Sequence, residues 1–162
     1  MEPSVVTMSI FLRFAGPSNS GKTTAISTLA KHLRNSNHRL AILKHSHHDL
    51  EISKKDSEQL FLASSEGSVT IGGNKIEIHL PSQEKTPKEW SNFLFPSADI
   101  ILVEGWRKHD LPTILLQREP FPQDWLLPKN CIAVIGLAWK ELPCFPCIED
   151  ALYWIEDYLK TQ

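Results

Sequence analysis

The chain lacks the features that mark several special classes of protein. Its 162 residues carry a formal net charge of −2, so no excess of basic residues points to nucleic acid or an anionic membrane surface. No apolar run approaches the roughly 20 residues that a membrane-spanning helix needs. The apolar stretch near the N-terminus carries Arg13 and therefore predicts a core strand, not a signal peptide. Repeats, low-complexity tracts and linkers are also missing, so we expect a single domain over residues 1–162.

Cysteine is scarce as well. Three cysteines, an odd number, do not make a disulfide framework, and beside the phosphate-binding loop described below they favour a reducing cytoplasm. Cys144 and Cys147 form a C-x-x-C pattern before the closing helix, a pattern that can be redox-active or bind metal. Nothing else in the chain resembles a thioredoxin-type unit, so we expect buried or half-buried thiols.

What the chain does have is a phosphate-binding pattern. Residues 16–23 read Gly-Pro-Ser-Asn-Ser-Gly-Lys-Thr, which fits G-x-x-x-x-G-K-[ST]. A polyphosphate needs many donors at once with no side chains in the way, and Gly16 and Gly21 allow the backbone to approach it closely. Successive N–H groups and the positive end of the following helix form an anion site. Lys22 can reach the β- and γ-phosphates, and the Thr23 hydroxyl can bind magnesium.

The sequence on either side supports this interpretation. An apolar run, Ile10–Phe14, precedes the loop, and apolar residues between Ala25 and Leu33 follow it at helical spacing. The pattern predicts a strand over about 9–15 and a helix over about 22–36. We therefore expect the chain to bind a nucleoside triphosphate, with a Gly/Ser-rich turn before an ordinary helix as the alternative.

A polar cluster follows the second predicted strand, Arg39–Lys44. It reads His45-Ser46-His47-His48-Asp49. Because the carboxyl ends of parallel strands share one edge of a sheet, we expect this cluster on the same rim as the phosphate-binding loop. Three histidines and an aspartate can bind metal, contact phosphate or place a water, and a solvated loop is the alternative. The spacing does not match a usual zinc site.

A second buried strand ends in an acid. Residues 98–105 read Ala-Asp-Ile-Ile-Leu-Val-Glu-Gly, which has the Walker B form. Such a strand carries its carboxylate to the rim beside the phosphate-binding loop. Glu104 can there bind magnesium, hold a ligating water or orient the attacking water. Gly105–Lys108 continues onto the rim and adds two cations, Arg107 among them, and the Trp106 ring.

The remaining pattern completes an α/β fold with a doubly wound sheet. Two short strands joined by Gly73-Asn74 predict a β-hairpin insertion. We expect further helices over 56–64, 86–95 and from Ile148 to Leu159, and further strands over 68–72, 75–80, 112–117 and 131–135. In such folds the loop after a late strand often reads the base.

Several stretches together resemble the molybdopterin-guanine dinucleotide biosynthesis protein B (MobB) family. They are residues 16–24, the Lys44–Asp49 cluster, Lys55-Asp56-Ser57, Ile100–Arg107 and Pro112 with Arg118. The resemblance implies a SIMIBI-type P-loop NTPase, three-layer α/β/α, with a mostly parallel (mixed) sheet. It also implies a cytoplasmic, homodimeric, GTP-binding accessory protein with weak Mg²⁺-dependent GTPase activity. Its partner would be the nucleotidyltransferase MobA, and molybdopterin is a further candidate ligand.

The resemblance also suggests site residues. Lys22, Glu104 and Asp49 are the candidate catalytic residues, and Thr23 and Glu104 are the candidate Mg²⁺ ligands. The residues expected to contact GTP are Gly16, Ser18, Asn19, Ser20, Gly21, Lys22, Thr23, Thr24, His47, His48 and Arg107.

The chain departs from the family pattern at two places. The family's Ala-Val-x-[ST]-Asp-like segment reads Ala-Val-Ile-Gly-Leu at 133–137, in the region associated with guanine recognition. An Ala-Gly-Ala segment is replaced by Ser64-Ser65-Glu66.

Two other classes remain open. A small-molecule P-loop kinase would close an arginine-bearing lid over the phosphates, but the chain has only five arginines and none clusters in a lid-like insertion. A non-catalytic adaptor would use the nucleotide only to stabilise an interface with a partner.

Overall fold

The computed structural model describes residues 9–46, 50, 55–120, 127–139 and 141–162. The chain divides into two compact units. One comprises residues up to His45 together with Thr86–Gln162, and the other comprises Ser46–Lys85. Each unit is described here by itself.

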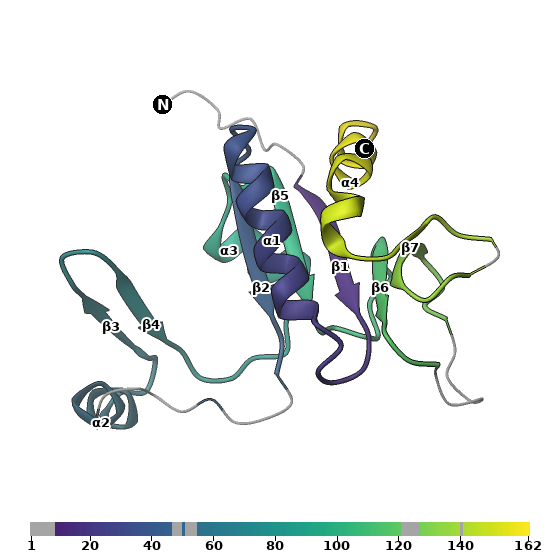
Figure 1. The fold of residues 1–162 in the computed structure, drawn as a ribbon. Helices are drawn as coiled ribbons and strands as arrows, with labels where there is room; N and C mark the ends of the chain where they lie inside the picture. The colour runs from purple at the N-terminus through teal and green to yellow at the C-terminus, as the bar shows by residue number, and fades with distance from the viewer. Residues whose placement is uncertain (1–8, 47–49, 51–54, 121–126, 140) are drawn as a thin grey trace. The chain divides into compact units, whose positions relative to one another are not determined.

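The first unit is built on a six-stranded sheet (Figure 1). The strand order is β2-β5-β1-β6-β7-β8, and all five pairings are parallel. The strands are β1 (Ile10–Ala15), β2 (Leu40–Lys44), β5 (Ile100–Glu104), β6 (Thr113–Gln117), β7 (Cys131–Gly136) and β8 (Cys144–Phe145). Parallel strands buried on both faces read as continuous apolar runs, which is why the strands other than β8 were recognisable. The predicted P-loop α/β fold with a hairpin insertion is confirmed.

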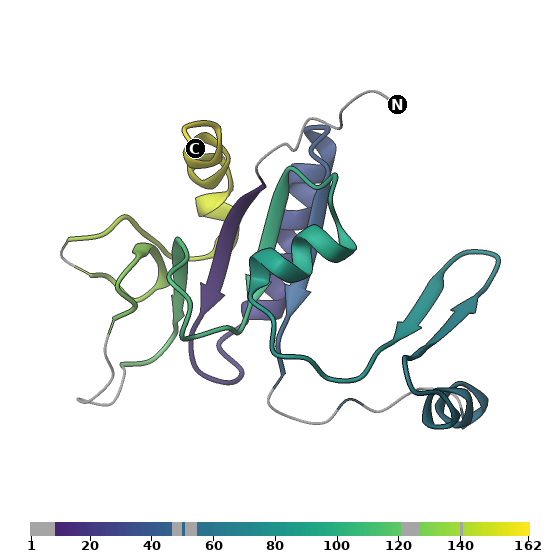
Figure 2. The same cartoon turned by 180° about the vertical axis from the view of Figure 1, so that it is seen from behind.

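Helices cover both faces of this sheet. Figure 1 shows α1 (Lys22–Asn35) and α4 (Ile148–Lys160) on one face, and Figure 2 shows α3 (Pro87–Leu94) on the other. The larger core lies under α1 and α4, where Leu12, Leu29 and Ile155 are fully buried. The smaller core lies on the opposite face, where Trp90 of α3 packs against strand residues such as Ile101.

Two details of this unit were not predicted from the sequence. The two-residue strand β8 was not predicted, because it consists of half-buried residues at the edge of the sheet and has no periodic pattern. Helix α3 buries Pro87 and Ser91, and its Phe93 is 61% exposed.

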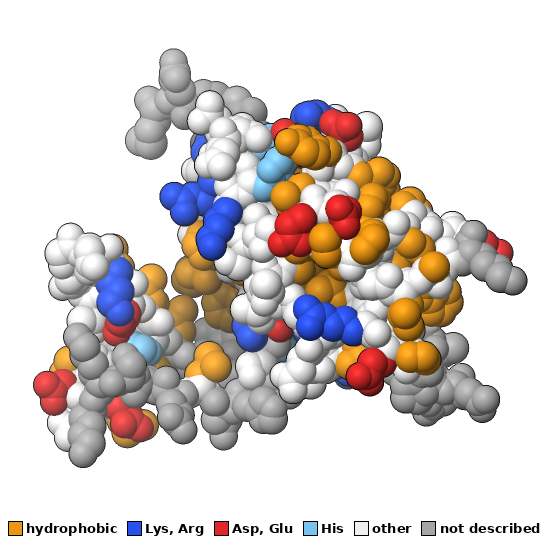
Figure 3. Space-filling view, viewed as in Figure 1, with side chains coloured by type: hydrophobic (Ala, Val, Ile, Leu, Met, Phe, Trp, Pro, Cys, Tyr) orange, Lys and Arg blue, Asp and Glu red, His pale blue; other side chains and the backbone are white. Residues whose placement is uncertain are grey.

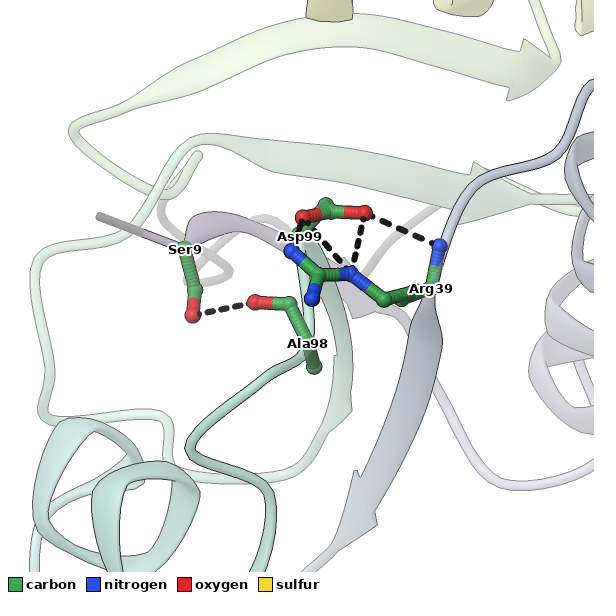
Figure 4. Close-up of polar contacts among 4 residues, drawn as sticks. All are labelled: Ser9, Arg39, Ala98 and Asp99. Carbon is green, nitrogen blue, oxygen red and sulfur yellow. Dashed lines mark hydrogen bonds and ion pairs between the residues drawn. The ribbon is translucent and has the colours of Figure 1, made fainter. Parts of the chain in front are cut away.

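The amino ends of β1, β2 and β5 are joined by polar contacts (Figure 4). The Arg39 guanidinium donates through Nε to Asp99 Oδ2 at 3.1 Å, and the Ser9 hydroxyl donates to the Ala98 carbonyl at 2.7 Å. Hydrogen bonding from Arg39 lowers the pKa of Asp99. Asp99 therefore forms an ion pair with Arg39 at the end of the strands opposite the phosphate-binding loop.

The second unit contains α2 (Lys55–Ala63) and an antiparallel hairpin of β3 (Ser68–Ile71) and β4 (Ile76–His79). The register pairs Val69 with Ile78 and Ile71 with Ile76. All four of these side chains are more than half exposed. None of the helices in the described ranges of either unit is long and apolar enough to cross a membrane.

Candidate functional site

The phosphate-binding loop joins the carboxyl end of β1 to the amino end of α1. Gly16 has φ 148° and Gly21 has φ 90°, both in the region that favours glycine. A β-carbon on Gly16 would come within 2.5 Å of the Leu116 carbonyl oxygen. The first glycine is therefore required both by its backbone conformation and by its contact with β6.

The loop presents polar groups that the protein itself does not satisfy. Ser20 is 6% exposed, and its hydroxyl oxygen has no hydrogen-bond partner among the described residues. A buried hydroxyl without a partner is costly, so the loop favours a ligand that bonds to it. Helix α1 starts with Gly21 at its N-cap, no side-chain cap and no acid in its first turn, which contains Thr23 and Thr24. Its amino end is therefore suited to an anion.

Lys22 lies over this loop. Its Nζ donates to the Pro17 carbonyl at 2.6 Å. Burial lowers the pKa of Lys22, and the cations Arg107 and Lys44 lower it further, whereas Glu104 raises it. The ammonium therefore sits beside the loop backbone in a partly desolvated position near two other cations.

Thr23 and Glu104 meet at the β5 side of the loop. The Thr23 hydroxyl donates to Glu104 Oε2 at 3.2 Å, although 81 residues separate them in sequence. Lys44 Nζ, at the end of β2, lies 3.6 Å from the other carboxylate oxygen. A hydroxyl and a carboxylate in this arrangement are the ligand types that Mg²⁺ takes from a protein beside a triphosphate. The donor set therefore fits the predicted metal.

The segment after Glu104 is held by a buried arginine. Arg13, 5% exposed, donates from Nη1 to the main-chain carbonyls of Trp106 at 2.9 Å and His109 at 2.8 Å. Its Nε donates to the Thr113 hydroxyl at 2.9 Å. Trp106 has φ 45°, and its ring lies 5.0 Å from the His45 ring, centroid to centroid. Arg13 thus fixes the turn that carries Trp106 and Arg107 away from the strand.

Three residues on the β6 side of the loop were not identified as site candidates from the sequence. They are Arg118, Gln117 and Trp139. A β-carbon on Gly21 would come within 2.8 Å of Arg118 Nη2, so this guanidinium lies against the loop. Gln117 accepts a hydrogen bond on Oε1 from the Trp139 indole N–H at 2.6 Å. The sequence indicated Arg118 through the family resemblance, Gln117 as the end of a predicted strand, and Trp139 only as part of the region after a late strand.

The structure describes only the first two residues of the predicted rim cluster, His45 and Ser46, and three others lie outside the described residues. These are His47, His48 and Asp49, so their predicted roles remain predictions. His45, the first residue of the cluster, lies next to β5. Its backbone N–H donates to the Glu104 carbonyl at 2.8 Å. Among the described residues, no group of three or more His, Cys, Asp or Glu side chains could hold a metal ion, and this includes Cys144 and Cys147.

A groove of about 380 Å³ runs between α1 and β2 and begins at Thr23 and Glu104. Ile42 in its wall is 46% exposed. Figure 3, viewed from the α1 side, shows basic side chains next to hydrophobic ones on this face. The other lining residues are Ile26, Ser27, Ala30, Lys31, Arg34, Leu40 and Lys44. The groove connects the loop to a basic and apolar surface.

Taken together, the rim holds four cations within reach of the loop or of Glu104, namely Lys22, Lys44, Arg107 and Arg118. Glu104 is the acid that the described contacts place among them. This excess of positive charge, the unpaired Ser20 hydroxyl and the glycine-lined backbone favour a polyphosphate.

Known proteins are similar to this chain in sequence and in fold. The family model described as molybdopterin guanine dinucleotide synthesis protein B (MobB) matches residues 11–138. The molybdopterin-guanine dinucleotide biosynthesis adapter protein of Haemophilus influenzae is 32% identical over 124 residues, covering 69% of this chain and 67% of that protein. The protein of the same name from Escherichia coli is 29% identical over 137 residues, covering 79% and 78%.

Solved structures match the fold along nearly the whole chain. The crystal structure of Bacillus subtilis MobB has a TM-score of 0.77 at 22% identity and covers 94% of this chain and 99% of that one. The MobB homologue of Bacillus stearothermophilus has a TM-score of 0.70 at 20% identity and covers 96% and 100%. At this level of identity, these matches show the shared fold.

Proposed function

This chain belongs to the MobB family, and from that membership we propose that it is a GTP-binding adapter protein in the biosynthesis of molybdopterin guanine dinucleotide. The observation that carries the proposal is the hydrogen bond between Thr23 and Glu104 beside the glycine-lined loop. The bond brings together a hydroxyl beside the phosphate-binding loop and a carboxylate at the end of β5. These are the two protein groups that hold Mg²⁺ next to a bound triphosphate in P-loop proteins. The names of the two curated relatives support the pathway and the adapter role.

The position of each residue indicates the part of the nucleotide that it would contact. The backbone N–H groups of Gly16 and of residues 18–24, Ser18 and Asn19 included, and the Ser20 hydroxyl bind phosphate oxygens. Lys22 neutralises charge on the β- and γ-phosphates. Thr23 and Glu104 would hold Mg²⁺, which supplies charge neutralisation to those oxygens when bound. Arg107 adds a cation from the neighbouring turn.

We propose that GTP hydrolysis is slow. Within the described residues, Glu104 is the acid whose contacts place it next to the loop, and it is already bonded to Thr23 and paired with Lys44. A carboxylate engaged in this way is a poor base for water. We propose that Asp49, together with His47 and His48, orients the attacking water.

The proposed setting is a homodimer in the cytoplasm that works with the nucleotidyltransferase MobA. The hairpin of the second unit supports the dimer, because Val69, Ile71, Ile76 and Ile78 form one exposed aliphatic face. A two-stranded hairpin with such a face is marginally stable unless another surface covers it.

Light scattering of the protein and of the Ile71→Lys variant tests the dimer. The Ile71→Lys variant should become monomeric, while the change Ser65→Lys, at an exposed position, should leave the dimer intact.

The experiment that tests the function is a paired titration of GTP and ATP with Mg²⁺, following both heat of binding and release of phosphate. Preferred binding of GTP with slow release supports the proposal. Preferred binding of ATP, or release only after a small acceptor is added, would indicate a P-loop kinase. Binding without any release would indicate a non-catalytic adaptor.

A further inference from the structure

The contacts of the phosphate-binding loop give the direction in which a bound nucleotide would lie. Thr23 and Glu104 meet on the β5 side of the loop, while Gly21 lies against Arg118 at the end of β6. Since β1 stands between β5 and β6, these two sets of contacts lie on opposite sides. If Mg²⁺ and the terminal phosphates bind at Thr23 and Glu104, the nucleoside would extend over the carboxyl ends of β6 and β7.

Two side chains able to recognise a base meet at these ends. Gln117 is the last residue of β6 and is 5% exposed, and half-buried Trp139 follows β7. The Trp139 indole N–H donates to Gln117 Oε1 at 2.6 Å. The backbones are also joined, because the Leu137 N–H donates to the Gln117 carbonyl at 2.9 Å. This pair is therefore built into the sheet edge.

The chemistry of the two groups fixes the orientation of the amide. An indole N–H only donates, so the atom of Gln117 that faces it must be the oxygen. The amide nitrogen, with its two N–H donors, is then on the other side of the group. Among the described residues, the hydrogen bond given for the Gln117 side chain is the one to its oxygen, so the nitrogen remains available to a ligand. Trp139 is itself held, because its main-chain N–H donates to the Cys144 sulfur at 3.0 Å.

We propose that Gln117, oriented by Trp139, selects the base of the bound nucleotide by donating from its amide nitrogen to a 6-oxo group such as that of guanine. Adenine carries an amino group at this position, and two donors would then face each other. The inference rests on the proposed nucleotide binding.

The test compares nucleotides that differ only at the base. Calorimetric titration of the wild-type protein with Mg²⁺ should give similar affinities for GTP and ITP, because both carry the 6-oxo group. ATP should bind about tenfold more weakly, which is the effect of one lost hydrogen bond with a donor left unpaired. ITP binding as weakly as ATP would overturn the proposal, because recognition would then lie at the 2-amino group that ITP lacks.

Two variants test the residues themselves. Gln117→Glu replaces the donors with acceptors, so GTP should bind about tenfold more weakly while ATP does not lose affinity. Gln162→Glu, the same change at the exposed last residue, is the matched control and should keep the wild-type ratio. Trp139→Phe removes the indole N–H but keeps a ring, and it should lower the GTP-to-ATP ratio without weakening ATP. Circular dichroism confirms that each variant is folded.

The outcomes separate this inference from the proposed function. If the wild-type protein binds no nucleoside triphosphate, both fail. If it prefers GTP and both Gln117→Glu and Trp139→Phe keep that preference, the inference alone fails. If Gln117→Glu does not fold, Trp139→Phe and the ITP comparison decide the question.

Discussion

Lys22 donates a hydrogen bond to the carbonyl of Pro17, five residues earlier in the same loop, at 2.6 Å. The contact directs the ammonium back over the loop backbone instead of out into solvent. Burial lowers its pKa, which means that the surroundings disfavour the charged form. An anion bound at the loop would stabilise the charged ammonium in place of the water that burial removes. The position of Lys22 therefore fits a charge-pairing role.

Lys22→Ala should therefore weaken triphosphate binding about hundredfold or more. The ammonium makes charge-assisted hydrogen bonds, each worth roughly 1.5–3 kcal/mol, and about 1.4 kcal/mol corresponds to tenfold in affinity. Calorimetric titration of GTP with Mg²⁺ measures the loss. Lys88→Ala, an exposed lysine of α3, is the control and should bind normally. Unchanged affinity in Lys22→Ala would rule out this loop as the phosphate site.

Glu104→Gln should reduce Mg²⁺-dependent phosphate release more than it reduces GTP binding. The amide keeps the hydrogen bond from Thr23 but loses the negative charge that a divalent cation needs. We expect release to fall at least about tenfold, and raising Mg²⁺ should recover part of it. Glu66→Gln, an exposed site in the second unit, serves as the control. Equal loss of binding and release would mean that Glu104 mainly supports the fold.

The phosphate-binding loop and the main strands could be predicted because their signals are local. Residues 16–23 carry their pattern within one loop, and β5 is a continuous buried run that ends in Glu104. The periodicity of α1 also reflects one face packed on one core, where Leu29 and Leu33 are fully buried. Such features need no knowledge of distant contacts.

Other features depend on contacts that no local pattern records. Arg13 looked like a charge inside an apolar stretch, yet its partners lie 93 to 100 residues away. Arg118 was noted only as part of the family resemblance, and Gln117 only as the last residue of a predicted strand. Their positions beside Gly21 and Trp139 follow from the order of the sheet, which places β6 next to β1 and β7.

Arg13→Met should lower the free energy of unfolding by about 2 kcal/mol, the scale expected when buried acceptors lose their donor. The methionine fills similar space but leaves the carbonyls of Trp106 and His109 without the guanidinium. Urea denaturation followed by circular dichroism measures the change. Arg34→Met, at an exposed position of α1, should stay within about 0.5 kcal/mol of the wild type. Equal stability of the two variants would show that Arg13 does not hold this turn.

The Arg39–Asp99 pair should contribute stability only above acidic pH. Hydrogen bonding from Arg39 lowers the pKa of the Asp99 carboxyl below its ordinary value of 3.8. The folded state then binds fewer protons than the unfolded state, so the contribution is complete above the ordinary pKa and is lost as the pH falls through the lowered one. Asp99→Asn should therefore be less stable than wild type at pH 7, and the difference should shrink in strong acid. A double-mutant cycle with Arg39→Gln isolates the pair, and a coupling energy independent of pH would contradict the assignment.

The three cysteines should differ in reactivity in an order set by exposure and charge. Burial raises the pKa of Cys131 to about 11, whereas Cys147 is exposed at the start of α4. The hydrogen bond to the Asp150 carboxylate raises the pKa of Cys147 and outweighs the lowering effect of the Asp150 backbone N–H. Since the thiolate is the reactive form, Cys147 should be alkylated first at pH 8 but more slowly than a free cysteine, and Cys131 last.

Replacing Asp150 tests the cause directly. Asp150→Ala removes the carboxylate, so the pKa of Cys147 should fall and its alkylation at pH 8 should speed up, while Cys131 should react at its original rate. Mass spectrometry of iodoacetamide-treated peptides over time gives the three rates separately. Glu141→Ala, at an exposed position before β8, is the control and should change none of them. A Cys147 that already reacts faster than free cysteine would show a lowered pKa and would restore the redox interpretation of the C-x-x-C pattern.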